Sequence, residues 1–98
     1  MREQYLGQIG HLLLEFGDLS EIHLKAVEVL NRTKNPTKQE VQSIPELRQA
    51  ARDKYTQLQA KIVEANTEYP EQVVSLSDFP DNLPPHIRAA LVAVGVEA

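Results

Sequence analysis

Three histidines are the side chains in this sequence best suited to bind a metal ion or to transfer a proton near neutral pH. They are His11, His23 and His86. No two of them are three or four residues apart, so the spacing that places two imidazoles on one helical face is missing. The zinc-protease signature, in which two histidines flank a glutamate on a helix, is also absent. We therefore predict no metal site and no bound cofactor.

The hydroxyl side chains show no sign of activation as nucleophiles. A catalytic serine or threonine needs a neighbouring base and a group that stabilises the oxyanion, and none of them lies in a Gly-x-Ser-x-Gly turn. Ser20, Thr37 and Ser43 stand at or beside expected helix starts, where capping explains them. The four glycines are scattered and form no phosphate-binding loop. We therefore expect a protein that is not an enzyme.

Length and composition predict one small domain that covers residues 1–98. Hydrophobic residues make up 42% of the chain, which is enough for a core. A compact chain of this length has a radius of gyration of about 13 Å. No cysteine is present, so disulfides and thiolate metal sites are excluded. The first residues are too polar for a signal peptide, and no run approaches the roughly 20 apolar residues of a membrane span. We expect a soluble, cytoplasmic protein.

The net charge of −4 is unevenly distributed along the chain. Residues 1–24 contain one basic and four acidic side chains, and residues 62–98 contain one basic and six acidic side chains. Between them, residues 25–61 contain eight basic and four acidic side chains. Such blocks either steer a partner or pair with each other within the fold, and the sequence leaves both alternatives open.

The N-terminal part of the chain reads as a helix over residues 2–16, because its apolar residues recur on one helical face. Gly7 and Gly10 each weaken this helix by about 1 kcal/mol relative to alanine. Close approach of another backbone would explain them. Gly17 follows directly as a C-terminal stop.

A second helix is expected over residues 19–30. Asp18, with Glu21 three residues later, has the spacing of a capping box. Leu24 and Val29 fall outside the apolar stripe of this helix. We therefore expect the helix to be covered on more than one side.

Two more capping boxes precede the longest helical pattern. Thr37 is followed by Glu40, and Ser43 is followed by Glu46. Because proline is tolerated in the first turn of a helix, we predict that the long helix starts at Pro45 and that a short separate turn precedes it. One continuous, kinked helix through this proline is the alternative.

The long helix is predicted over residues 45–68 and ends before Pro70. Its apolar residues are spaced close to a heptad repeat, and its opposite face is polar. The rod would be about 36 Å long, and the two earlier helices laid end to end would just line it. The apolar seam consists of Leu47, Ala51, Tyr55, Leu58, Ile62, Ala65 and Tyr69.

Residues 70–85 contain four prolines and no helical period, and we predict a loop there. A last helix follows, capped by Asn82 or Asp81 and stopped at Gly95. The predicted fold is therefore all-α: a small three- or four-helix bundle around one long helix, with a proline-rich crossover loop and a short C-terminal helix.

The C-terminal region has more apolar residues than one helical stripe needs. Seven of the eight residues from Ile87 to Val94 are apolar. Either this helix is central to the core or part of it contacts another chain, and the preceding loop either wraps over the bundle or docks on a partner. The candidate partner-binding residues are Phe79, Leu83, Ile87, Leu91 and Val94.

We predict a non-enzymatic protein–protein interaction module, such as an adaptor, an assembly factor or an inhibitor of a larger complex. The partner would be another protein, or a second copy of the chain that associates along the seam of the long helix. We expect no binding to a membrane. The alternative is a nucleic-acid-binding regulator that uses the basic segment 25–61, although the acidic residues among its bases weaken that reading. The residues for this alternative are Arg32, Lys34, Lys38, Arg48 and Arg52.

Overall fold

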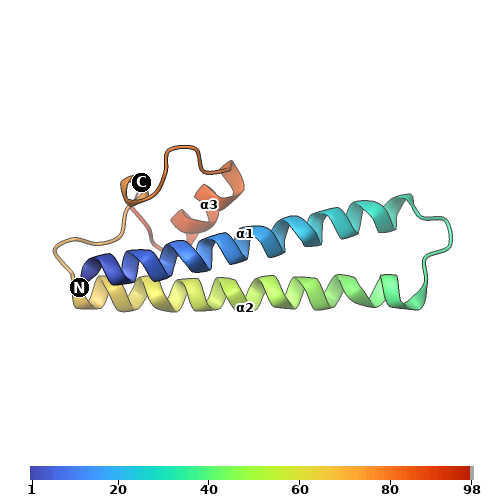
Figure 1. The fold of residues 1–98 in the computed structure, drawn as a ribbon, viewed down its shortest axis with the longest axis horizontal. Coiled ribbons are helices and arrows are strands. Elements are labelled where there is room, and N and C mark those ends of the chain that lie inside the picture. The colour runs from blue at the N-terminus through green and yellow to red at the C-terminus, as the bar shows by residue number, and fades with distance from the viewer. Residues whose placement is uncertain (98) are drawn as a thin grey trace.

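Two long antiparallel helices form a hairpin, and the rest of the chain packs against one part of it (Figure 1). The computed structural model describes residues 1–97. Helix α1 spans Arg2–Arg32 and helix α2 spans Lys38–Glu68. A 3-10 turn, η1, and a short helix, α3, follow at Leu76–Asp78 and Pro85–Ala93. The predicted all-α fold is confirmed.

The prediction of two separate N-terminal helices is wrong, because α1 continues through Gly17. Asp18 lies inside α1 and is not an N-cap. One glycine costs a helix interior about 1 kcal/mol, which packing along a neighbouring helix can exceed. Here Phe16 stacks on Tyr55 of α2, with ring centroids 5.4 Å apart. Tertiary packing therefore carries the helix across the expected stop.

The predicted start of the long helix at Pro45 is also wrong, and the alternative of one continuous helix is correct. The Thr37 hydroxyl accepts a hydrogen bond from the Glu40 amide at 3.1 Å, and the Glu40 carboxylate accepts one from the Thr37 amide at 3.4 Å. This capping box places Thr37 at the N-cap of α2, so the helix begins at Lys38. The Ser43 hydroxyl instead donates to the Glu40 carbonyl at 2.7 Å. Pro45 lies within the helix.

The end of α2 and the last helix lie where the sequence predicts them. Helix α2 ends at Glu68, two residues before Pro70. The expected cap at Asn82 or Asp81 is wrong, because Pro84 occupies the N-cap position of α3 and makes no side-chain capping bond. Gly95 has a φ of +98°, a left-handed conformation that suits a glycine stop.

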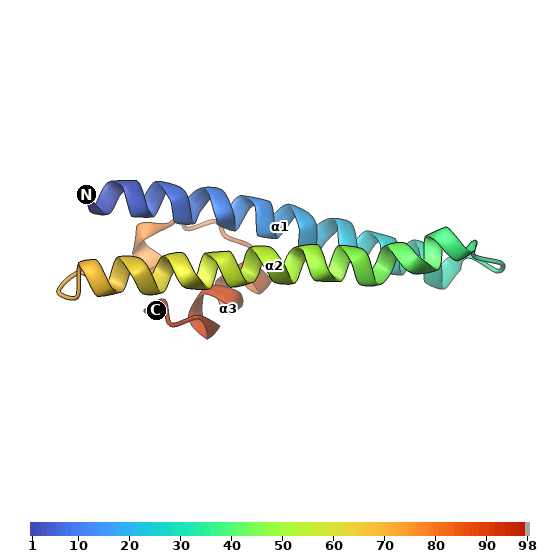
Figure 2. The same ribbon diagram turned by 90° about the horizontal axis from the view of Figure 1, so that it is seen from below.

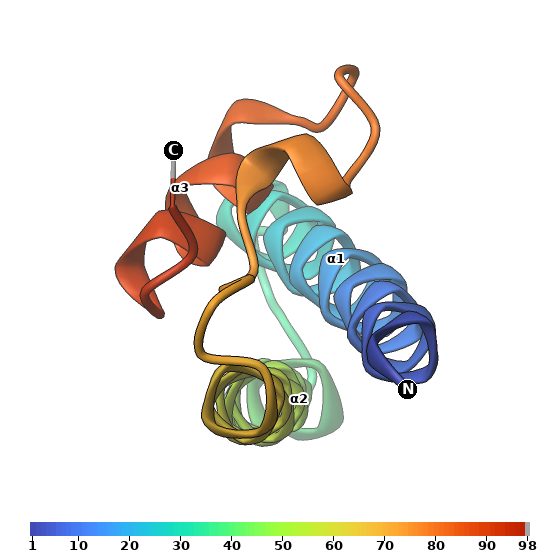
Figure 3. The ribbon, with the colours of Figure 1, turned by 90° about the vertical axis from the view of Figure 1, so that its left-hand side faces the viewer.

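The hydrophobic core lies at one end of the hairpin, where the C-terminal segment (residues 70–97) wraps over the start of α1 and the end of α2. A single parallel bridge between Ser75 and Glu97 joins the two ends of this segment. In Figure 3 the segment lies on one side of the hairpin, in the angle between α1 and α2. The loop therefore wraps over the bundle. Within the described residues, the buried hydrophobic side chains are Ile9, Leu13, Leu58, Ile62, Ala65, Val74, Phe79, Ile87, Leu91, Val94 and Val96.

The molecule is elongated, with extents of 55 × 22 × 18 Å. Its radius of gyration is 15.9 Å, which exceeds the value of about 13 Å expected for a compact chain. The cause is the length of α1 and α2, which span 31 residues each, whereas α3 has 9. Figure 2 shows both long helices continuing well beyond α3. Among residues 1–97, no helix is long and apolar enough to cross a membrane.

Gly7 and Gly10 provide a test of the packing of α1, because no neighbouring atom lies within 4 Å of the position that a Cβ would occupy at either residue. The close backbone approach expected from the sequence is therefore not present within the chain. We expect Gly7→Ala and Gly10→Ala each to raise the free energy of unfolding by about 0.5–1 kcal/mol, because alanine lowers the entropic cost of forming the helix. Urea denaturation measures the change.

Gly95→Ala is the control, since the positive φ of Gly95 disfavours any residue with a Cβ. This variant should lower the free energy of unfolding. If Gly7→Ala or Gly10→Ala also lowered it, the open space at those positions would be disproved.

Candidate interaction surface

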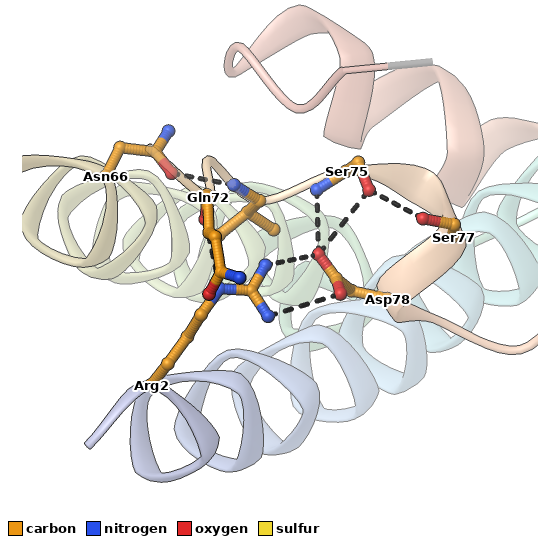
Figure 4. Close-up of polar contacts among 7 residues, drawn as sticks. Arg2, Asn66, Gln72, Ser75, Ser77 and Asp78 are labelled. Carbon is orange, nitrogen blue, oxygen red and sulfur yellow. Dashed lines mark hydrogen bonds and ion pairs between the residues drawn. The ribbon is translucent and has the colours of Figure 1, made fainter. Parts of the chain in front are cut away.

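An ion pair between Arg2 and Asp78 joins the start of α1 to the C-terminal segment (Figure 4). The guanidinium donates two hydrogen bonds to the carboxylate, at 2.8 Å from Nη2 and 3.4 Å from Nη1. The Arg2 Nε atom also donates to the Gln72 carbonyl at 3.0 Å. Such a bidentate pair fixes orientation as well as distance.

Helix α2 holds the same segment from the other side. The Asn66 side-chain carbonyl accepts a hydrogen bond from the Val74 amide at 2.8 Å. The Asp78 carboxylate accepts another from the Ser75 amide at 3.0 Å, which closes the turn of η1. These contacts place Val74 and Phe79 in the core. They therefore determine which part of the hairpin the segment covers.

The environment of Asp78 shifts the pKa of its carboxyl group. Partial burial alone would raise this pKa. The hydrogen bonds from Arg2 and from the Ser75 amide, together with the positive charge of Arg2, outweigh this effect and hold the pKa below its usual value. Because the pKa is lower in the folded than in the unfolded chain, the carboxylate stabilises the fold above the unfolded pKa. That contribution is lost as the pH falls through the folded value.

The residues predicted to bind a partner lie in or against the core of the chain itself. Phe79, Ile87, Leu91 and Val94 are buried, with 0–9% of their surface exposed. Leu83 is partly buried and packs against this core. Of the two alternatives left open by the sequence, the structure therefore supports the core position for α3.

The seam of the long helix is likewise turned inward. Its second half supplies Leu58, Ile62 and Ala65 to the core, and its first half, including Leu47 and Ala51, is half-buried. A second copy cannot reach the buried part of this seam without displacing the chain's own packing.

Eight large apolar side chains are exposed among residues 1–97. Four of them lie at the covered end, Met1, Leu14, Val63 and Val92, and the other four lie on the part of the hairpin that the C-terminal segment leaves uncovered. We call residues 18–54 the arm. No residue of the arm is buried. Where two helices pack without a third layer, much of each helix stays open to solvent. The large apolar side chains that the arm exposes, with their exposed fractions, are Ile22 (50%), Leu24 (57%), Val29 (56%) and Val41 (47%).

Two of these positions correct a sequence prediction. Leu24 and Val29 lie outside the stripe of their helix, and from this the sequence predicted covering on more than one side. Each is more than half exposed, so the chain itself does not provide that cover. Both residues lie outside the apolar stripe, as the sequence indicates, but the sequence does not show that the hairpin extends beyond α3 and leaves them uncovered.

The inner seam of the arm is only partly apolar. Ser20, His23 and Ser43 are half-buried along it, beside residues such as Leu30 and Ile44. The Nε2 atom of His23 is buried and has no hydrogen-bond partner among residues 1–97. At the base of the arm, Glu15 accepts a hydrogen bond from Lys54 at 2.6 Å, which lowers the pKa of this glutamate.

The basic residues predicted for nucleic-acid binding all lie on the arm. Lys34 is in the turn between the long helices. Arg32 is the last residue of α1, and the other three lie along α2. Within residues 1–97, only Arg32 among the five is in an ion pair, with Glu28 at 3.5 Å. All five are exposed: Arg32, Lys34, Lys38, Arg48 and Arg52.

No group of three metal-ligating side chains that could hold an ion occurs in the described part of the chain. Comparisons of the chain with protein-family models, curated protein sequences and solved structures found no match. The candidate interaction surface therefore rests on the residues of the arm alone.

The anchor at Asp78 makes a pH-dependent prediction. We expect Asp78→Asn to lower the free energy of unfolding by about 1–3 kcal/mol near neutral pH, because it weakens charge-assisted hydrogen bonds. The difference from wild type should shrink as the pH falls below about 4, the usual pKa of an aspartate, because the wild-type carboxylate loses its stabilising charge as it becomes protonated. Urea denaturation at each pH measures it.

Asp81→Asn is the matched control, because Asp81 is exposed in the same segment and only its backbone carbonyl accepts a hydrogen bond, from Arg88 at 2.9 Å. It should leave stability nearly unchanged. Equal effects of the two substitutions, or an Asp78→Asn effect independent of pH, would contradict the assigned role.

Proposed function

We propose that the chain is a non-enzymatic protein–protein interaction module that binds its partner through the arm. The observation that carries this proposal is the contrast between the two ends of the hairpin. One end is covered by the C-terminal segment and contains the whole buried core of the described residues, whereas the arm contains no buried residue. The arm exposes four large apolar side chains that no third layer covers, and exposed apolar side chains on a protruding structure are typical of a binding surface.

The amount of exposed surface supports the same proposal. The accessible surface of the chain is 6757 Å². A compact monomer of 11.0 kDa is expected to expose about 5,600 Å². The difference, about 1,100 Å², is larger than the roughly 800 Å² that each partner buries in an interface of standard size. The elongated chain therefore exposes enough surface for a specific complex.

An adaptor, an assembly factor and an inhibitor of a larger complex all use such a surface, and we include all three in the proposal. We also propose a cytoplasmic location, which the cysteine-free sequence supports because reducing compartments disfavour disulfides.

Nucleic acid is the second candidate, favoured by the gathering of exposed basic side chains on the arm. Acidic residues are interspersed with them, including Glu40, Glu46 and Asp53 on α2. Binding through phosphate contacts would weaken steeply with salt. If the partner is a protein, titration with duplex DNA or RNA at low and high salt should show no such binding. Tight, salt-sensitive binding would favour the second candidate instead.

Site-specific photo-crosslinking tests the protein-binding proposal directly. A photoreactive amino acid would replace Leu24 on the arm or, as a matched control, Val63 at the covered end, since their exposed fractions are 57% and 56%. After irradiation of cells that naturally express the chain, we expect discrete adducts of higher mass from position 24 only. No adduct at position 24, or the same adducts from both positions, would contradict the proposal.

A further inference from the structure

The charged side chains of α2 are sorted onto two sides of the helix. It carries five acidic and five basic residues, and an α-helix turns by about 100° per residue. On this spacing all five acidic residues fall within an arc of about 140°. Lys54 and Lys61 lie in the same arc, and each forms an ion pair, with Glu15 at 2.6 Å and with Glu64 at 3.1 Å. The basic residues on the acidic side of α2 are therefore already paired.

The other three basic residues of α2 lie on the opposite side. Lys38, Arg48 and Arg52 fall within an arc of about 80° that contains no acidic residue. All three are exposed, and none forms an ion pair within residues 1–97. Val41 lies in the same arc and is 47% exposed. We call these four residues the basic stripe.

The acidic residues of α1 within the arm do not pair with the basic stripe. Two of the three, Glu21 and Glu28, each pair with the basic residue four positions later on α1, at 3.1 and 3.5 Å. The third, Asp18, lies about half a turn out of phase with the buried Ile9, on the outer side of α1. In the described part of the chain, neither helix of the arm therefore supplies a partner for the charges of the stripe.

The basic stripe lies on the side of the hairpin that the C-terminal segment covers further along. Asn66 marks this side of α2, because it accepts a hydrogen bond from the segment, and Arg48 precedes it by about five full turns. On α1, the Cδ1 atom of Ile87 is 3.5 Å from the position that a Cβ of Gly17 would occupy, and Leu24 follows Gly17 by about two turns. Leu24 and the basic stripe therefore lie on the same side of the arm.

We propose that the partner of the arm binds the basic stripe through an acidic segment of its own chain. This inference rests on the proposed function and names the chemistry of the partner. Carboxylates of the segment lie against the three basic residues, and an apolar side chain between them contacts Val41. Arg48 and Arg52 are about one turn apart, so both guanidinium groups reach the same stretch of the partner, and each can hold a carboxylate through two hydrogen bonds.

The surroundings of the stripe favour an acidic protein segment over a nucleic acid. From Lys38 to Arg52 the stripe extends only about 21 Å. Outside residues 25–54 the chain contains three basic and ten acidic side chains, a net charge of −7. A duplex that continues along the hairpin meets this acidic end, whereas a short acidic segment stops before it. Val41 also offers an apolar contact that a phosphate backbone does not use.

Fluorescence anisotropy with labelled probes tests the chemistry of the stripe. The first probe is a helical peptide of about 14 residues in which glutamates flank a row of leucines. The second has lysine in place of each glutamate, and the third is a DNA duplex of similar length. At low salt we expect the glutamate peptide to bind more tightly than the other two probes. Its affinity should fall as salt is added, because salt screens exposed charges.

Arg48→Gln combined with Arg52→Gln should weaken binding of the glutamate peptide at least about fivefold, because two ion pairs are lost. Lys25→Gln combined with Arg32→Gln is the matched control. It removes the same net charge from the arm, but from bases that are already paired on α1, and it should change the affinity less than about twofold. Circular dichroism checks that both variants stay helical.

Four results of this experiment would overturn the proposal. Tighter binding of the duplex would assign the stripe to nucleic acid instead. Equal binding of the two peptides would show that charge does not select the partner, and equal effects of the two double variants would show that the stripe is not the site. A glutamate peptide that does not bind at about 1 mM would remove the proposal as well.

The natural partner provides the second test. A photoreactive amino acid replaces Val41, cells that naturally express the chain are irradiated, and mass spectrometry identifies the crosslinked stretch of the partner. We expect this stretch to contain more aspartate and glutamate than lysine and arginine. The adduct should become weaker when Arg48→Gln and Arg52→Gln are added, but not when Lys25→Gln and Arg32→Gln are added.

The two proposals fail in different ways. A partner protein that is crosslinked at position 24 or 41 through a stretch without an acidic excess overturns the acidic segment but still supports the interaction module. Adducts that nuclease treatment removes overturn both proposals. If neither position gives an adduct, both fail as well.

Discussion

The antiparallel pairing of α1 and α2 determines where every other part of the chain lies. Both helices span 31 residues, and their pairing sets the length of the seam between them. The third layer is much shorter, because α3 has only 9 residues and its segment is held at one end of the hairpin by Arg2 and Asn66. A small core and a long uncovered arm follow from this difference in length.

The elements that sequence patterns predicted well are those in which local and tertiary preferences agree. The seam from Leu47 to Tyr69 predicted a long helix, and Gly95 predicted the end of the last one; both are confirmed. Two of the failures, at Gly17 and Pro45, share a cause. Each residue is a helix breaker by local rules, and each lies within a helix that packing against its partner stabilises along its whole length. The sequence shows the local cost of a breaker but not the packing that offsets it.

The candidate site could be predicted only in part. A surplus of apolar residues around Ile87 and Leu91 did indicate an unusually buried element, but composition cannot distinguish a core from an interface, and these side chains are in the core. The exposed positions Leu24 and Val29 were visible as apolar residues outside their stripe. Recognising them as uncovered needed the place where α3 ends relative to α1, and that is fixed by long-range contacts such as the one between Gly17 and Ile87.

The composition of the arm connects its stability to binding. Its seam contains Ser20, His23 and Ser43 among apolar residues, and a segment with few buried apolar contacts opens more readily than a core. Any partner that binds the closed arm and not the open one shifts this equilibrium by its own binding free energy. The contacts of such a partner with the arm would therefore also hold the arm closed.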